Sequence, residues 1–194
     1  MRPHEMMATT GRAVLEIAGN VKPDQLGLPS PCPDWDVRAV VNHLMFWSAF
    51  RSELAARKES APADDPVTEQ TDFTAEGDWF EVLRTQLDRA TQAWSEPGAL
   101  DGDTGLAGGS MPAPVIAMMM VGELVLHGWD LAAATGQRLD IDDATARAVY
   151  ESTAAMAEQG RSYGAFGEEV PVPADASPLD RVLGLSGRDP SWKP

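Results

Sequence analysis

The chain has 194 residues, of which 43% are hydrophobic and 23% are charged. This length and apolar content predict a folded protein with one core and exclude a low-hydrophobicity disordered chain. Lys and Arg number 15 against 30 Asp and Glu, so the net charge is −15, which disfavours binding to nucleic acid or to an anionic membrane surface. We expect a single domain over residues 1–194, with a helical body at about 4–160 and a C-terminal extension at about 161–194.

Cysteine usage and apolar runs indicate the compartment. Cys32 is the only cysteine, which excludes an intramolecular disulfide framework. The N-terminal residues lack the continuous apolar run of a secretory signal. The most apolar stretch, Met111–Thr135, contains three ionisable residues that are costly in lipid, so it is predicted to be a buried helix and not a membrane span. A cytoplasmic protein is expected.

The first half of the chain shows three helical patterns. The first is an apolar stripe spaced by three and four residues that ends before Pro23, formed by Met7, Thr10, Val14, Ile17 and Val21. A proline-rich turn at 29–33 follows, and Asp36 can cap a second helix that runs to about Lys58. The acidic stretch Glu59–Leu83 is predicted to be a solvated loop that leads into a capped helix. This third helix ends at Pro97 and carries Phe80, Leu83, Leu87, Ala90 and Trp94.

The glycine-rich stretch Gly98–Ser110 is predicted to be a flexible connection, and it matches neither a phosphate loop nor a dinucleotide fingerprint. A fourth helix is expected to begin near Pro112 or Pro114, because proline costs little in the first helical turn. Gly136 is a suitable residue to end that helix.

A fifth helix, capped by Asp142 or Asp143, is predicted to reach Gln159. The tail contains a short extended piece, Val170–Pro173, and a brief helix, Pro178–Leu185. No alternating pattern is long enough for a sheet. The predicted fold class is therefore all-α, most simply a four-helix bundle with short C-terminal additions.

Two histidines and a carboxylate carry the clearest chemical signal. Glu123 and His127 are four residues apart and therefore lie on one face of the fourth helix, and Asp130 extends that face. A carboxylate amid so apolar a run is costly to bury unless it is paired or bound to a cation. With His43 on the second helix, these residues form a reasonable three-ligand site for a divalent metal, with positions open for water or substrate.

The same residues also allow a purely structural interpretation. Glu123 and His127 could hydrogen-bond each other across one helical turn, and His43 could be a core histidine with a satisfied hydrogen bond. The sequence contains no H-E-x-x-H motif and no G-x-S-x-G motif, so a zincin-type protease and a serine hydrolase are not supported.

Three ordered blocks resemble a known family. Residues 31–44, PCPDWDVRAVVNHL, look like the "PCPxWxVRxLxxH" opening of the actinobacterial DinB/YfiT-like proteins, and more narrowly of the metal-binding family related to the N-terminal domain of mycothiol-dependent maleylpyruvate isomerase. Residues 123–136, ELVLHGWDLAAATG, are similar to the "HxWDLAxATG" signature of that family. The tail, with Phe166, Val170–Pro173, Leu179–Leu183 and Gly187–Pro190, resembles the family's ending.

The resemblance implies a DinB-like four-helix bundle with a metal ion held by His43, Glu123 and His127. The implied ion is zinc, with nickel or iron as alternatives, and the implied partners are a low-molecular-weight thiol, mycothiol, and a small electrophile. A metal-bound thiol is deprotonated near neutral pH, and the thiolate is the attacking species. The isomerase is expected to carry a separate C-terminal domain, for which 194 residues leave no room.

Function therefore has three competing interpretations. The first is a thiol-dependent S-transferase or isomerase. The second is a non-haem iron enzyme, because two histidines and one carboxylate also form the facial triad of such iron sites. The third is a metal-containing stress or binding protein without turnover.

Other residues receive narrower predictions. Asp130 is expected to accept a hydrogen bond from a ligand histidine, or else to act as a solvent-facing or capping group. Cys32 is interpreted as a packed turn residue, and Met118–Met120 as core filling or the wall of an apolar substrate pocket. Arg181 and Arg188 are expected in salt bridges, with an anionic substrate as the alternative partner.

Overall fold

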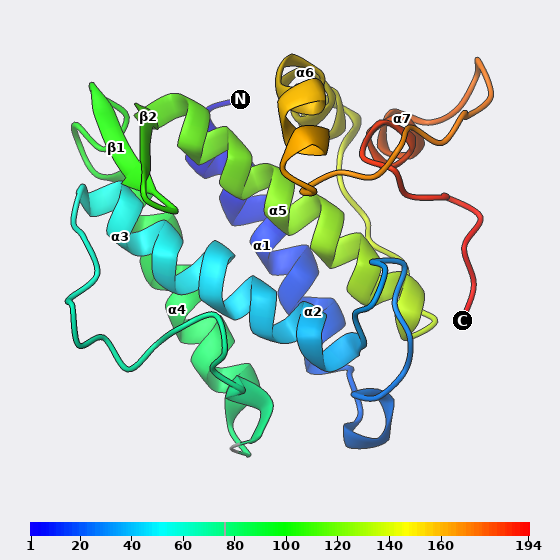
Figure 1. Cartoon of the computed structure of the whole chain (residues 1–194), viewed down its shortest axis with the longest axis horizontal. Coiled ribbons are helices and arrows are strands. Elements are labelled where there is room, and N and C mark those ends of the chain that lie inside the picture. Colours follow the sequence, from blue (N-terminus) through cyan, green and yellow to red (C-terminus); the bar gives the residue numbers. More distant parts are fainter. Residues whose placement is uncertain (76) are drawn as a thin grey trace.

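Helices make up most of the computed structural model, which describes residues 1–75 and 77–194 (Figure 1). The long elements are α1 (Pro3–Gly19), a continuous helix at 37–57, α4 (Trp79–Ser95), α5 (Ala113–Ala134) and α6 (Asp143–Ser162). Shorter ones are α7 (Pro178–Leu185) and the 3-10 turns η1 (Pro23–Gln25) and η3 (Phe73–Ala75). The predicted helices are confirmed, with ends that differ by a few residues.

The helix at 37–57 changes its hydrogen-bonding pattern in its middle. It consists of α2 (Val37–His43), a π-helical segment η2 (Leu44–Arg51) and α3 (Ser52–Arg57). Asp36 caps it as predicted, since its carboxylate accepts a hydrogen bond of 2.8 Å from the backbone N–H of Ala39. Apolar periodicity did not predict the π segment, which begins directly after His43. Wide turns of this kind recur at functional sites.

The core forms around α5, which packs against α1, the 37–57 helix and α6, while α4 packs against α1 and α3. The helix α5 is long and apolar enough to cross a membrane, yet 67% of its most apolar window is buried inside the fold. Its apolar character therefore serves the core, as expected of a central helix.

The glycine-rich connection contains a small sheet, so the prediction of a purely flexible link without strands was wrong. Strands β1 (Asp103–Leu106) and β2 (Gly109–Pro112) pair antiparallel. Between them Ala107 and Gly108 have φ of 52° and 77°, the left-handed conformation that a two-residue hairpin turn requires. Strands of four residues are too short to show an alternating pattern, and Ala-Gly is a weaker turn signal than Asn-Gly.

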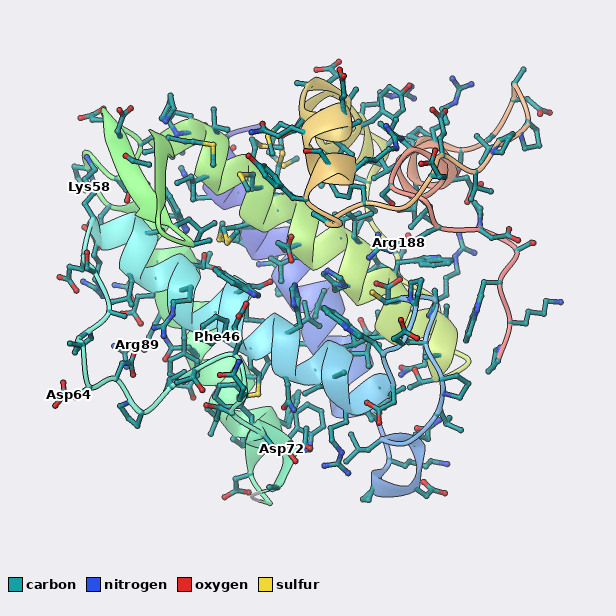
Figure 2. All side chains as sticks on the ribbon, in the orientation of Figure 1. Phe46, Lys58, Asp64, Asp72, Arg89 and Arg188 are labelled. Atoms are coloured by element: carbon teal, nitrogen blue, oxygen red, sulfur yellow. The ribbon has the colours of Figure 1, made fainter. Side chains whose placement is uncertain are left out.

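The C-terminal elements cover one side of α5. The helices α6 and α7 pack together, and α6 also packs on α5 (Figure 1). The extended piece at 170–173 lies beside α7, where the N–H of Val170 donates to the carbonyl of Gly184 at 2.9 Å. A Cβ at Gly184 would lie 2.5 Å from the Val170 oxygen, so this approach requires glycine. Just beyond α7 the chain brings Arg188 down towards α5 (Figure 2).

Candidate metal centre

The fold brings the three predicted ligands together. His43 is the last residue of α2, and Glu123 and His127 lie one turn apart on α5. One ligand atom from each lies within 4.8 Å of the other two. The two histidines also approach ring to ring, with centroids 4.3 Å apart. Sequence spacing predicted the α5 pair, and the packing of α2 on α5 adds His43.

Glu123 bonds the distant histidine more closely than the neighbouring one. Its Oε2 lies 2.7 Å from Nε2 of His43 and 3.5 Å from Nε2 of His127. The structural alternative of a simple Glu123–His127 hydrogen bond is therefore not what the geometry shows. Burial of Glu123 would raise its pKa, but the hydrogen bond with His43 and the charges of neighbouring groups outweigh burial and lower that pKa to about 2. The carboxylate is ionised at neutral pH.

Asp130 fixes the orientation of His127. Its Oδ2 accepts a hydrogen bond of 2.9 Å from Nδ1 of His127, and the side chain of Asp130 is fully buried. With the proton on Nδ1, the lone pair of Nε2 faces Glu123 and His43. This is the orienting role that sequence spacing suggested for Asp130, and full burial rules out a solvent-facing role.

Arg188 neutralises this buried aspartate. Its Nε donates to Oδ1 of Asp130 at 2.8 Å and its Nη2 donates to Oδ2 at 2.7 Å, a two-point pair. Burial would raise the pKa of Asp130, but the charge of Arg188 and the hydrogen bond from His127 lower it. Arg188 thus forms a salt bridge, whereas Arg181 donates to the backbone carbonyls of residues 174 and 176.

His127 is held as a neutral imidazole. Burial lowers its pKa, and this effect exceeds the opposing influence of Asp130 and Glu123. A neutral imidazole with a fixed Nδ1–H offers Nε2 as a ligand without first losing a proton.

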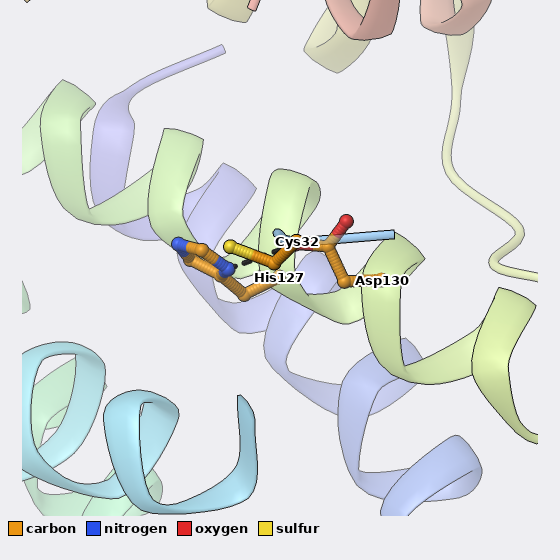
Figure 3. A group of neighbouring side chains, drawn as sticks. All are labelled: Cys32, His127 and Asp130. Carbon is orange, nitrogen blue, oxygen red and sulfur yellow. Dashed lines mark hydrogen bonds and ion pairs between the residues drawn. The ribbon is translucent and has the colours of Figure 1, made fainter. Parts of the chain in front are cut away.

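The proline-rich turn closes over the two histidines. The Trp35 ring lies 4.8 Å from the His43 ring and 5.5 Å from the His127 ring, measured between centroids. Cys32, on the same turn, joins His127 and Asp130 in a second group of donor atoms (Figure 3). Sequence distance gave no sign that this cysteine lies beside a histidine.

Cys32 is a thiol and not a thiolate in this setting. Burial, followed by the negative charge of Asp130, raises its pKa to about 11. Since Nδ1 of His127 already bonds Asp130, the group with Cys32 offers fewer free donor atoms than the group of His43, Glu123 and His127. Its role as a packed turn residue accords with this chemistry.

Two cavities reach the site from different sides. One of about 240 Å³ lies between α5 and α6 and includes Glu123 and His127 in its lining. The other, of about 320 Å³, borders His43 and Trp35. Met118 and Met119 line the first cavity, whereas Met120 is buried in the core, so the three adjacent methionines divide between the two roles considered for them.

The donor set fits one divalent cation. Two imidazole nitrogens and one carboxylate oxygen converge, the carboxylate is ionised, and the second nitrogen of His127 is anchored by an aspartate, as in many histidine metal ligands. Three protein ligands leave a coordination position open. Zinc, nickel and iron are all compatible with this set.

Comparisons with known proteins relate most of the chain to one family. The model of the mycothiol maleylpyruvate isomerase N-terminal domain matches residues 7–132, a span that contains His43, Glu123, His127 and Asp130. Two uncharacterized proteins from two strains of Mycobacterium tuberculosis are each 28% identical over 178 residues, covering 91% of this chain and 92% of each relative.

Solved structures share the fold. The crystal structure of mycothiol-dependent maleylpyruvate isomerase superposes with a TM-score of 0.63 at 16% identity, covering 97% of this chain and 89% of that chain. A mutant of that isomerase gives a TM-score of 0.57 at 16% identity, covering 87% and 73%. At 16% identity these superpositions show a shared fold, which spans 89% of one isomerase chain and 73% of the other.

Proposed function

The chain belongs to the mycothiol maleylpyruvate isomerase N-terminal domain family, and on this premise we propose that it is a divalent-metal-dependent enzyme that joins a low-molecular-weight thiol, mycothiol, to a small electrophile, as an S-transferase or an isomerase. The observation that carries the proposal is the convergence of His43, Glu123 and His127 beside two cavities. We further propose one cytoplasmic domain over residues 1–194 whose core is a DinB-like four-helix bundle of α1, the 37–57 helix, α4 and α5.

His43, Glu123 and His127 would hold the ion, with zinc as the proposed metal. When bound, such an ion lowers the pKa of a thiol at its open position, so that the sulfur is a thiolate near neutral pH. Two features of the chain support this use. Asp130 keeps His127 in the tautomer that presents Nε2, and Trp35 together with the apolar wall of α5 limits the access of water.

The proposed chemistry balances without an added oxidant. The thiol gives up its proton, and the sulfur forms a bond to an electrophilic carbon. In a transfer, the leaving group departs with the electron pair of the broken bond. In an isomerisation, the carbon–sulfur bond breaks again after rotation about the former double bond, and the thiol is regenerated. The two cavities provide separate approaches for the two substrates.

The test combines metal analysis with a thiol-consumption assay. Protein purified without chelator is expected to contain one divalent ion per chain and to consume mycothiol with an electrophile. His43→Ala should lose both properties. His4→Ala, the same change at the histidine outside the group, should keep both.

A cobalt-substituted sample examines the thiol step directly, because sulfur bound to cobalt gives a charge-transfer absorption band. A band that forms on addition of mycothiol supports the proposal. Bound cobalt without a band for any thiol would overturn it. Iron with oxygen uptake and no thiol loss would favour the non-haem iron enzyme, since the same donor set suits that metal.

A further inference from the structure

The cavity between α5 and α6 adjoins the metal centre yet has the wall of an apolar binding site. Its lining includes Glu123 and His127 at one end. The rest is dominated by apolar side chains: Met111, Met118, Met119, Leu126, Val149, Met156 and Phe166. Ser152, Thr153 and Gln159 are the neutral polar contributors from α6.

Among the described residues, no side chain offers a ligand in this cavity a free positive charge. Among the described residues that line this cavity, Arg188 is the only lysine or arginine. All three of its guanidinium nitrogens are engaged, two with Asp130 and the third with Ser186 at 3.2 Å. The carboxylate of Glu123 adds a negative charge to the same lining. The two positive charges of the proposed ion would be balanced by Glu123 and by the bound thiolate, so a ligand carboxylate would lose its hydration without gaining a counter-charge.

The size and chemistry of the walls favour one flat ring. A volume of about 240 Å³ lies below the roughly 300–1,000 Å³ of sites for drug-sized ligands. Methionine sulfurs and the Phe166 ring make favourable contacts with aromatic groups. The Phe166 ring packs directly against Gly160, where an added Cβ would lie 2.4 Å from the ring. This close contact fixes the position of Phe166 in the cavity wall.

The cavity beside His43 suits the other substrate. Trp35, Phe46 and Trp47 form its apolar side. On its polar side, Glu69 and Gln70 can hydrogen-bond a polar, hydroxyl-rich thiol. The apolar cavity is then left for the electrophile.

From this division we infer that the electrophile is an uncharged, apolar molecule of about one aromatic ring, bound between α5 and α6, and not a small dicarboxylate. The inference rests on the proposed function for the reaction itself. The binding preference of the cavity stands apart from it, because it requires neither thiol nor metal.

The first experiment measures binding alone, by equilibrium dialysis of the full chain with two unreactive probes. Uncharged meta-dinitrobenzene is expected to bind about tenfold or more tightly than dinitrobenzoate, which carries one carboxylate. Ser152→Phe should fill the cavity from α6 and weaken dinitrobenzene binding by about tenfold or more. Gly122→Leu should fill the cavity from α5 and weaken dinitrobenzene binding in the same way. A Cβ at position 122 would lie 3.8 Å from the Val149 side chain, an ordinary contact distance, so the helix can accept the larger residue. Ala154→Phe adds the same ring on the exposed side of α6 and should leave binding unchanged.

The second experiment compares turnover of chlorodinitrobenzene and chlorodinitrobenzoate with mycothiol, each relative to its uncatalysed rate. In both, sulfur bonds to the ring carbon, chloride leaves with its electron pair and the thiol proton passes to solvent. The uncharged substrate should be accelerated more. Equal acceleration of both, or tighter binding of dinitrobenzoate, would overturn the inference and leave the thiol reaction intact. Selective binding of dinitrobenzene without any thiol consumption supports the cavity assignment and contradicts the proposed function.

Discussion

Asp130 orders the candidate metal centre, because it bonds His127 on one side and Arg188 on the other. Both it and Arg188 are buried, with exposed fractions of 0% and 7%. Removing one partner of such a pair leaves the other as an uncompensated buried charge.

Asp130→Asn preserves the shape of the side chain but removes its charge. We expect the free energy of unfolding to fall by about 3–5 kcal/mol and metal affinity to fall by about 10–100-fold. Urea denaturation and metal titration measure the two effects. Asp88→Asn, at an aspartate whose side chain is 71% exposed on α4, should change stability by less than about 1 kcal/mol. An Asp130→Asn protein with unchanged metal affinity would show that Asp130 does not orient His127.

At the scale of elements, a buried glutamate joins α3 to α4. Glu53 Oε2 accepts a hydrogen bond of 2.5 Å from Gln86, and Oε1 accepts bonds of 3.0 Å from Arg57 and from Arg89. Burial would raise the pKa of Glu53, but these hydrogen bonds, led by that from Gln86, lower it. The unfolded chain therefore takes up a proton at this residue before the folded chain does as the pH falls.

The stabilisation from Glu53 should thus be complete above a pH of about 4.5 and decline as the pH falls through the lowered pKa of the folded state. Glu53→Gln should reduce the free energy of unfolding at pH 7 by about 1.5–3 kcal/mol and make its decline below pH 4.5 shallower. Denaturant titrations at a series of pH values test this. Glu81→Gln, at an exposed position of α4, serves as the control, with an expected change within about 0.5 kcal/mol. Equal pH profiles for Glu53→Gln and the unmodified chain would contradict the prediction.

Elements with long periodic patterns could be predicted from sequence, and those set by tertiary contacts could not. The stripe through Met7, Val14 and Ile17 specifies α1, because burial of one face governs both pattern and packing. The π segment at 44–51 and the hairpin at 103–112 leave no such trace. The same apolar residues are compatible with a π-helical turn and with an α-helical turn, so their pattern does not distinguish the two. The hairpin depends on the left-handed conformations of Ala107 and Gly108 and not on a repeated pattern.

At the scale of the whole molecule, the core is expected to hold together without an ion in the candidate metal centre. Buried apolar residues from α1, the 37–57 helix, α4 and α5 form one continuous cluster. His127→Ala should therefore abolish metal binding and leave the chain helical, unlike a zinc finger. Zinc at about 100 times its Kd should stabilise the unmodified chain by about 2.7 kcal/mol and leave this variant unchanged. Circular dichroism and thermal melts with and without zinc are the measurements. A random-coil spectrum for the variant would mean that the histidine maintains the fold.

The candidate metal centre could be predicted only in part, because sequence spacing encodes contacts within one helix and not contacts between distant segments. Glu123, His127 and Asp130 share a helical face, so their proximity follows from local geometry. Arg188 lies 58 residues beyond Asp130, and no periodicity links the two. The proximity of Cys32 to His127 arises from the folding of the proline-rich turn onto α5, which spacing does not encode.

The long separation of Asp130 from Arg188 sets an order of events during biosynthesis. Ribosomes add about 5–20 residues per second, so the 58 residues that follow Asp130 take roughly 3–12 s to emerge. The segments of α1 to α4 and most of α5 are synthesised before this interval begins, and their core can assemble while Asp130 still lacks its cation. The candidate metal centre is thus expected to be completed only after this core has assembled. A nascent chain that stalls before codon 188 carries an uncompensated buried carboxylate, which marks it as an unstable product for cellular quality control.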